Sequence, residues 1–292
     1  MTMASRRADR RLLVVALLST VCAAAGAQQK FTTRVDSVRL DALVTADGRP
    51  VVGLTESEFE VRDNGVLQAV TILGAGAFPI DVVLALDMSS SLPPERLEAL
   101  RSASEGLLDA VRTDDRVALL TFNHAVTRHQ ALTSDTSAVR EALAGMRPSG
   151  ATALTDAMYA GIGSLESTDR RTLLLVFSDG IDTASWLTAA AVVDVARRSG
   201  TVVYVVSAAD PARTPEVIRE VTDATGGDIL HVDSRRLTTA FVRILEEFRQ
   251  RYILSYTHRS TPAPGWHELE VHVKRRGAVV RTRQGYFVRD TR

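Results

Sequence analysis

Ile80-Asp-Val-Val-Leu-Ala-Leu-Asp87-Met-Ser-Ser-Ser91 is the stretch that decides the fold, because a long apolar run ends there abruptly in a carboxylate followed by serines. A run of this length, rich in Val and Leu, is typical of a parallel strand covered on both faces. Leu92-Pro-Pro-Glu95 follows, and proline with an acidic residue is typical of a helix start. Ligands bind at the carboxyl ends of strands in open α/β sheets, where we expect Asp87, Ser89 and Ser91 to lie.

The central region continues as an alternation of strand and helix patterns. Strands separated by helices imply parallel pairing with right-handed crossovers. We therefore predict an α/β domain with a doubly wound, mostly parallel sheet over residues 78–250. The predicted strands are 80–87, 116–122, 172–177, 201–207 and 229–232, with 126–131 as an edge strand, and the predicted helices are 95–111, 137–146, 155–165, 187–198, 215–225 and 237–251.

Both flanks of this region have strand character. Asp47-Gly48 and Asn64-Gly65 are strong hairpin signals, because both central positions of a type I′ turn need positive φ. Segments this small, without disulfides, do not easily build a core alone. We predict that residues 28–77 and 251–292 pack together as one β-sandwich-like module, into which the α/β domain is inserted. Its predicted strands are 37–44, 51–52, 58–62, 67–73, 252–256, 267–273 and 278–283.

Residues 1–27 have the pattern of an export signal. Four arginines precede the apolar segment Leu12–Leu18, and Ala25-Gly26-Ala27 is a small-residue cleavage pattern. An uncleaved membrane anchor is the alternative, but the segment is shorter than the ~20 residues that span a bilayer. We expect a periplasmic or extracellular protein with no membrane span after cleavage. Cys22, the only cysteine, would leave with the signal, and the remaining chain would carry a formal charge of about −3, so nothing in the charge indicates a nucleic-acid partner.

Two further stretches place polar groups at the same predicted edge of the sheet. Thr152 precedes a predicted helix, and the strand ending at Ser178 is followed by Asp179. Together with Asp87, Ser89 and Ser91, they offer only carboxylate and hydroxyl oxygens. Such hard ligands suit Mg²⁺ or Ca²⁺, and a site with few carboxylates and room for water favours Mg²⁺.

In this order and on these elements, Asp87-x-Ser89-x-Ser91, Thr152 and Asp179-Gly180 resemble the metal-ion-dependent adhesion site of von Willebrand factor type A domains. The flanking sequences resemble those of bacterial exported proteins related to this family. The resemblance implies that Ser89, Ser91 and Thr152 offer hydroxyls to the metal, that Asp87 and Asp179 bind it directly or through water, and that an Asp or Glu of a partner completes the coordination. Ala151 departs from the pattern, which often has a second glycine there.

The interpretation is an exported, non-enzymatic protein-binding module that recognises an acidic group through Mg²⁺, with Mn²⁺ and Ca²⁺ as alternative ions. One alternative is a structural component of the cell envelope without metal-dependent binding. Another is a phosphatase of the haloacid dehalogenase type, but Ser89 stands where that family needs a second carboxylate. His124 and His129 lack the acidic partner of a zinc-protease helix, so we expect a surface role for them. Ser90 is predicted to cap or face solvent, and Asp182 to be a turn residue.

Overall fold

The computed structural model describes residues 37–75, 78–165, 169–178, 181–258 and 262–288. The predicted export signal and Asp179, which was predicted to belong to the metal site, lie outside these ranges. Within them, no helix has both the length and the apolar character needed to cross a membrane.

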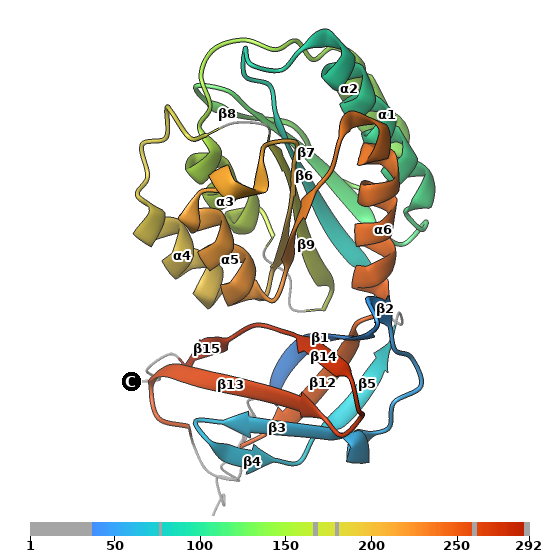
Figure 1. The fold of residues 1–292 in the computed structure, drawn as a ribbon, viewed down its shortest axis with the longest axis vertical. Helices are drawn as coiled ribbons and strands as arrows, with labels where there is room; N and C mark the ends of the chain where they lie inside the picture. Colours follow the sequence, from blue (N-terminus) through green and yellow to red (C-terminus); the bar gives the residue numbers. More distant parts are fainter. Residues whose placement is uncertain (1–36, 76–77, 166–168, 179–180, 259–261, 289–292) are drawn as a thin grey trace, which may run out of the picture. The chain divides into compact units, whose positions relative to one another are not determined.

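The strand β6 (Ile80–Asp87) lies at the centre of a six-stranded sheet, as its apolar sequence predicts (Figure 1). The strand order is β11-β10-β9-β6-β7-β8, and every neighbouring pair is parallel except β7 and the edge strand β8. The chain builds outward from β6 in both directions, so the carboxyl ends of β6 and β9 meet at a topological switch point. The other strands are β7 (Arg116–Phe122), β8 (Val126–Thr133), β9 (Arg171–Ser178), β10 (Val202–Ser207) and β11 (Asp228–His231).

Helices cover both faces of this sheet. Alternation along β6 sends Val82 and Leu84 to one core cluster and Val83 and Ala85 to the other. The first cluster packs against α1 (Pro94–Ala110), α2 (Thr136–Ala144) and α6 (Leu237–Arg249), and the second against α3 (Leu154–Gly163), α4 (Ala189–Arg198) and α5 (Glu216–Thr225). All six helices are at the predicted places, and short 3₁₀ turns lie at Glu56–Glu58, Pro211–Arg213 and Ser234–Arg236.

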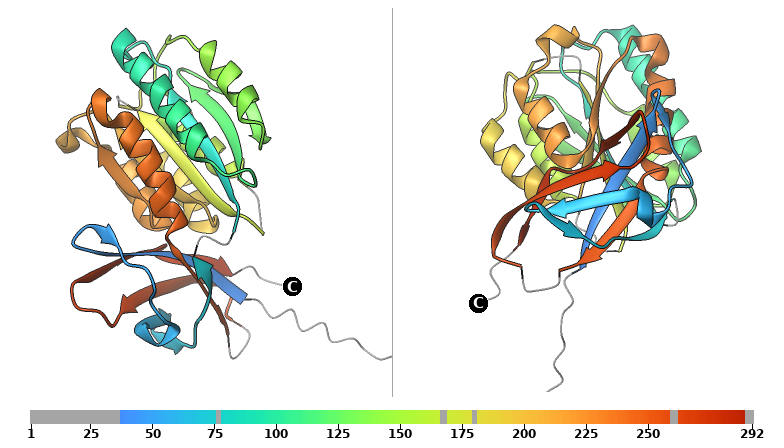
Figure 2. Two further views of the ribbon diagram at one scale, coloured as in Figure 1. Left: turned by 90° about the vertical axis from the view of Figure 1, so that its right-hand side faces the viewer. Right: turned by 60° about the horizontal axis from the view of Figure 1, so that its bottom comes forward.

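Strands from the two ends of the chain interleave in a β module of two antiparallel sheets (Figure 2). The long strand β1 pairs with β12 on one side and with β14 on the other. This confirms the predicted fold class, an α/β domain accompanied by a module built from both termini. One sheet contains β1 (Ser37–Ala46), β2 (Arg49–Pro50), β5 (Thr71–Ala75), β12 (Tyr252–Thr257) and β14 (Ala278–Arg281), and the other β3 (Phe59–Asp63), β4 (Val66–Gln68), β13 (Gly265–Val273) and β15 (Gly285–Val288).

The module differs from the sequence expectation in three places, of which the first is the strand β15, which was not predicted. The predicted strand 67–73 is wrong as a single element, because β4 pairs with β3 in one sheet and β5 with β12 in the other. The predicted strand 51–52 is also wrong: the strand is Arg49–Pro50, directly after the turn. Both hairpin turns are confirmed, since Asp47, Gly48, Asn64 and Gly65 all have positive φ.

Candidate functional site

Asp87 ends β6 with a fully buried carboxylate. A buried charge needs donors, and Asp87 has them at both oxygens. Its Oδ1 accepts the backbone N–H of Ser89 at 2.9 Å, and its Oδ2 accepts the hydroxyl of Ser178, the last residue of the neighbouring strand β9, at 2.8 Å. The carboxylate is therefore held at the junction of the two central strands.

The loop after Asp87 brings two predicted hydroxyls together. The Oγ atoms of Ser89 and Ser91 lie 2.9 Å apart, as expected for alternate residues on one side of the loop. The intervening Ser90 is exposed, and both its N–H and its hydroxyl donate to the carbonyl of Gly150 at 2.9 Å. Ser90 thus ties this loop to the one that carries Thr152, a role that the sequence interpretation did not foresee.

Both the backbone N–H and the backbone carbonyl of Thr152 form hydrogen bonds, and these fix its position. Its N–H donates to the hydroxyl of Thr183 at 3.1 Å, and its carbonyl accepts the N–H groups of Thr183 and Ala184. Gly150 has φ +76°, and a Cβ there would lie 2.6 Å from His124 Nδ1, so glycine is required at this position. Ala151 is not strained: among the described non-glycine residues, only Asp47 and Asn64 have positive φ.

A cavity of about 390 Å³ opens at this edge of the sheet and is lined by the residues whose hydroxyls were predicted to bind metal. Ser89, Ser91 and Thr152 line it, and Asp87 lies one hydrogen bond away from the lining residues Ser89 and Ser178. Four of the five predicted metal-site residues are therefore brought together, and the fifth, Asp179, lies outside the described residues. The rest of the lining comprises Ser90, Gly150, Ala151, Ile181, Thr183, Val205, Ser207, Ala209, Asp210, Arg213, Thr214, Pro215 and Ile218.

The cavity wall also contains a carboxylate that sequence reasoning missed. Asp210 is exposed and lies three residues after the end of β10, whose residues 202–206 are apolar and whose last residue is Ser207, so its position only partly resembles that of Asp87. Its Oδ1 accepts the N–H of Ala212 at 2.9 Å, which places it at the start of a 3₁₀ turn. A carboxylate within three residues of the end of an apolar strand was the signal that could have found it.

Asp182 and His129, for which we expected a turn and a surface position rather than metal binding, lie as predicted, and His129 is exposed. Asp182 accepts the N–H groups of Thr155 and Ser185, as a turn residue would. Burial alone would raise the pKa of Asp182, but these hydrogen bonds outweigh burial and lower it. His129 Nε2 lies 2.8 Å from the Thr121 hydroxyl on the neighbouring strand.

The fold and the order of these residues agree with a family comparison. The model of the von Willebrand factor type A (VWA) domain matches residues 81–240, which is more than half of the chain. The chain belongs to the VWA family. Domains of this family commonly bind a divalent cation.

Individual relatives of this VWA protein are distant. An uncharacterised protein of Synechocystis sp. is 29% identical over 107 residues, which are 35% of this chain and 25% of that protein. A von Willebrand factor type A structure from Catenulispora acidiphila is 13% identical with a TM-score of 0.54, covering 88% of this chain and 75% of its own. The PilB minor pilin of Streptococcus sanguinis, as a mutant, is 14% identical with a TM-score of 0.52, covering 61% of this chain and 63% of its own. At these identities the two structures show the shared fold alone.

Proposed function

We propose that this chain is an exported protein-binding module whose VWA domain holds Mg²⁺ through Asp87, Ser89, Ser91, Thr152 and Asp179. The proposal rests on one observation: Ser89, Ser91 and Thr152, from two separate loops, line the same cavity beside the buried carboxylate of Asp87. Hydroxyl and carboxylate oxygens are the donors that Mg²⁺ accepts, and Mn²⁺ and Ca²⁺ are the competing ions. When bound, the cation would supply a positive charge that attracts a carboxylate.

The chain's own groups at this site favour recognition of an acidic side chain. Ser91 is exposed, and its Oγ lies 2.9 Å from that of the buried Ser89, so a partner could approach this pair from the side of Ser91. The partner we propose is therefore a protein or peptide that presents Asp or Glu. The PilB minor pilin shares the fold, and an adhesive or assembly role at the cell surface is consistent with that similarity.

Binding without catalysis is the simpler role for this cavity. Its described lining residues include no histidine, lysine or cysteine, and the lining carboxylate Asp210 accepts the N–H of Ala212 at the start of a 3₁₀ turn. The phosphatase alternative would also need a second carboxylate where Ser89 donates its N–H to Asp87. We therefore propose that the protein is not an enzyme.

Titration calorimetry with Mg²⁺ and Mn²⁺ tests the metal site, with Asp87→Ala and Ser89→Ala as variants. Asp194→Ala, which removes an exposed carboxylate on α4, is the matched control. We expect one saturable site in the wild type and in the control, and its loss in both site variants after circular dichroism has confirmed their folding. Equal binding by the wild type and Asp87→Ala would exclude the proposed site.

Partner recognition requires a second measurement on the same proteins. An array of peptides that carry Asp or Glu, each beside its Asn or Gln counterpart, is probed with the protein in Mg²⁺ and in EDTA. We expect binding that needs both the carboxylate and the metal. Metal binding without carboxylate preference would favour the alternative of a structural envelope component, and turnover of a generic phosphate ester would favour the phosphatase.

A further inference from the structure

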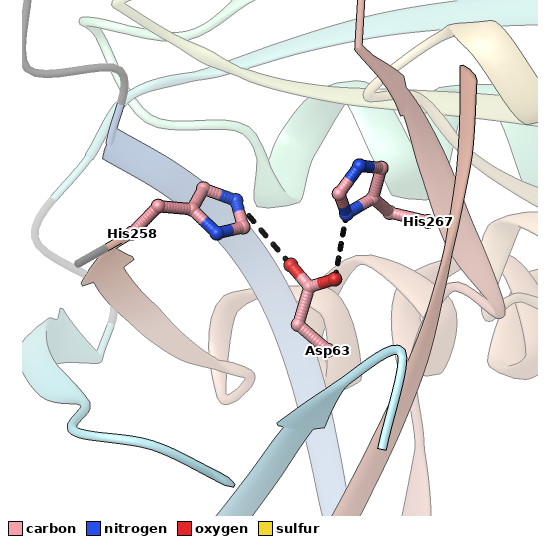
Figure 3. A group of neighbouring side chains, drawn as sticks. All are labelled: Asp63, His258 and His267. Carbon is pink, nitrogen blue, oxygen red and sulfur yellow. Dashed lines mark hydrogen bonds and ion pairs between the residues drawn. The ribbon is translucent and has the colours of Figure 1, made fainter. Parts of the chain in front are cut away.

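A second polar cluster lies inside the β module, far in sequence from the VWA motif (Figure 3). Asp63 ends β3, His267 is in β13, and His258 directly follows β12. Asp63 and His267 are 3% and 6% exposed, and His258 is half-buried. Two imidazoles and a carboxylate in a small core are costly to bury, so their arrangement calls for a physical explanation.

Strand pairing aims these side chains at one point. In β3, Phe59, Val61 and Asp63 are the buried residues, so Asp63 occupies an inward position of the alternation. In β13, Leu269 pairs with Asp63, and His267 lies two residues before it on the same face. Because neighbours on one face of a strand pair are within reach of long side chains, His267 meets Asp63 across the ladder.

The three side chains present their ligand atoms together. An Asp63 carboxylate oxygen and one ring nitrogen from each histidine all lie within 4.8 Å of one another. His267 Nδ1 is 2.7 Å from Asp63 Oδ1, and His258 Nε2 is 3.4 Å from Asp63 Oδ2. Bonds of about 2.0–2.2 Å in a tetrahedral zinc site imply ligand atoms roughly 3.4 Å apart. The second separation matches this value, whereas the first is shorter and involves the other carboxylate oxygen, so the carboxylate would have to shift for one oxygen to serve both histidines. His258 Nε2 also lies 2.6 Å from the Tyr286 hydroxyl, and a bound zinc ion would replace that hydrogen bond.

The surroundings match those of a metal-binding histidine and carboxylate. His267 Nε2 lies 2.8 Å from the carbonyl of Ala263, which holds the ring with Nδ1 directed at Asp63. Metal-ligating histidines almost always donate their second N–H to such a partner. The hydroxyls of Tyr256 and Tyr286 donate to Asp63 Oδ2 at 2.5 and 2.7 Å, which orients the carboxylate in turn.

We infer that Asp63, His258 and His267 form a binding site for a divalent transition-metal ion of the zinc class, separate from the VWA cavity. Two imidazole nitrogens and one carboxylate oxygen suit Zn²⁺ and are poor ligands for Mg²⁺ or Ca²⁺. His258 follows a strand of one sheet, whereas Asp63 and His267 belong to the other. Zinc bound here would therefore join the two sheets, and the N-terminal part of the chain to its C-terminal part.

Zinc titration of the full-length, chelator-treated protein tests this inference, with His258→Gln as the site variant. His272→Gln is the matched control, because His272 lies in the same strand as His267 with a side chain that is 68% exposed. We expect one Zn²⁺ per chain and a melting temperature that rises with zinc. Affinity should fall by at least about 100-fold in His258→Gln, since loss of an outer partner alone costs about 10–100-fold. His272→Gln and Asp87→Ala should bind as the wild type does.

Substitution of Co²⁺ keeps the inference testable if His258→Gln does not fold. The wild type should give the intense visible absorption of four-coordinate cobalt, displaced by one equivalent of Zn²⁺ and unchanged by excess Mg²⁺. Weak octahedral absorption, no binding, or equal zinc affinity in the wild type and His258→Gln would overturn the site. The cluster would then be a hydrogen-bonded network closed by Tyr256 and Tyr286 alone.

Discussion

The two polar clusters of this molecule differ in their side chains and in the sheets that carry them. The first offers oxygens at the edge of a parallel sheet, and the second combines imidazole nitrogens with a carboxylate inside an antiparallel module. At the edge of the parallel sheet, Ser89, Ser91 and Thr152 offer only oxygens from loops that follow or precede regular elements. Inside the β module, Asp63 meets two imidazoles, with Asp63 and His267 on paired antiparallel strands. A parallel sheet gathers polar groups at one edge, where a partner can reach them, whereas a two-sheet module gathers them in its interior, where they hold strands together.

The two regions also share a framework, and breaking it should produce the largest effect. Arg171, the first residue of β9, is fully buried; its Nε donates to Asp41 of β1 at 2.7 Å, and its Nη2 to the carbonyl of Phe248 in α6 at 2.5 Å. Arg171→Ala would remove the guanidinium that the Asp41 carboxylate accepts from, and would leave the Phe248 carbonyl with backbone donors such as the N–H of Arg251. We expect a loss of about 3–5 kcal/mol of unfolding free energy, measured by denaturant titration.

The matched control for this loss is Arg236→Ala, since the Arg236 side chain is 68% exposed in an ion pair with Asp233, three residues before it. It should cost less than about 0.5 kcal/mol. A loss below about 1 kcal/mol in Arg171→Ala would mean that the β module and the VWA domain are stabilised independently.

The second prediction compares Mn²⁺ and Zn²⁺ affinities between a variant of one cluster and a variant of the other. Asp87→Ala should weaken Mn²⁺ binding by at least about 100-fold, or about 2.8 kcal/mol, and leave Zn²⁺ binding unchanged. His258→Gln should weaken Zn²⁺ binding and leave Mn²⁺ binding unchanged, because the His258 imidazole contributes nothing to the oxygen-lined cavity. Calorimetric titration of both variants with both ions measures all four affinities. If either variant lost both ions, the clusters would not be independent sites.

The sequence carried enough information to place the first cluster but not the second. Asp87 and Thr152 could be predicted because each lies beside a strongly patterned element, and parallel strands bring their carboxyl ends to one edge without knowledge of the register. Asp63 and His267 are 204 residues apart, and their meeting depends on the pairing of β3 with β13. The alternation in 267–273 was read from Leu269 onward, and the same alternation also turns His267 inward.

The missed parts of the first cluster lie in irregular segments. Ser90 and Thr183 act through backbone groups of other loops, and those contacts follow from loop conformations that strand and helix patterns do not determine. The split of 67–73 into β4 and β5 has the same origin, since a short break at Ala69 and Val70 sends the chain from one sheet to the other. Periodicity predicted the helices and strands, but it did not predict the loop contacts or the point where the chain passes from one sheet to the other.

A pH-dependent prediction concerns Asp115, which lies where β6 and β7 begin, at the end of the sheet away from the VWA cavity. Asp115 is buried and accepts hydrogen bonds from Arg249 of α6 and from the N–H groups of Ile80 and Arg112, the last two at 2.8 Å. Burial alone would raise its pKa, but these donors outweigh burial and lower the pKa below the usual value near 4. Its contribution to stability is therefore present above about pH 4 and is lost as the pH falls through the folded-state pKa.

Asp115→Asn should cost roughly 2 kcal/mol at pH 7, because hydrogen bonds to a charged group are lost. Between pH 7 and pH 3 the variant should then lose less stability than the wild type does. Denaturant titrations at both pH values measure this difference, with Asp194→Asn as an exposed control. A variant whose acid sensitivity equalled that of the wild type would show that Asp115 does not carry this dependence.

The smallest predicted effect uses the two tryptophans, one in each region. Trp186 is 91% exposed, and it follows Ile181 and Thr183, which line the VWA cavity, within one loop. An exposed aromatic beside a recognition site is a typical contact for a protein partner. We expect Trp186→Ala to weaken binding of the acidic peptides selected on the array by about tenfold, or about 1.4 kcal/mol, without changing Mn²⁺ affinity.

Trp266→Ala is the matched control, because Trp266 lies in the β module and is 36% exposed. It should leave peptide binding unchanged, and quenching of tryptophan fluorescence by the peptide should disappear only in Trp186→Ala. Equal weakening by both substitutions would place part of the partner's footprint on the β module, and the division between a recognition edge and a structural interior would no longer hold.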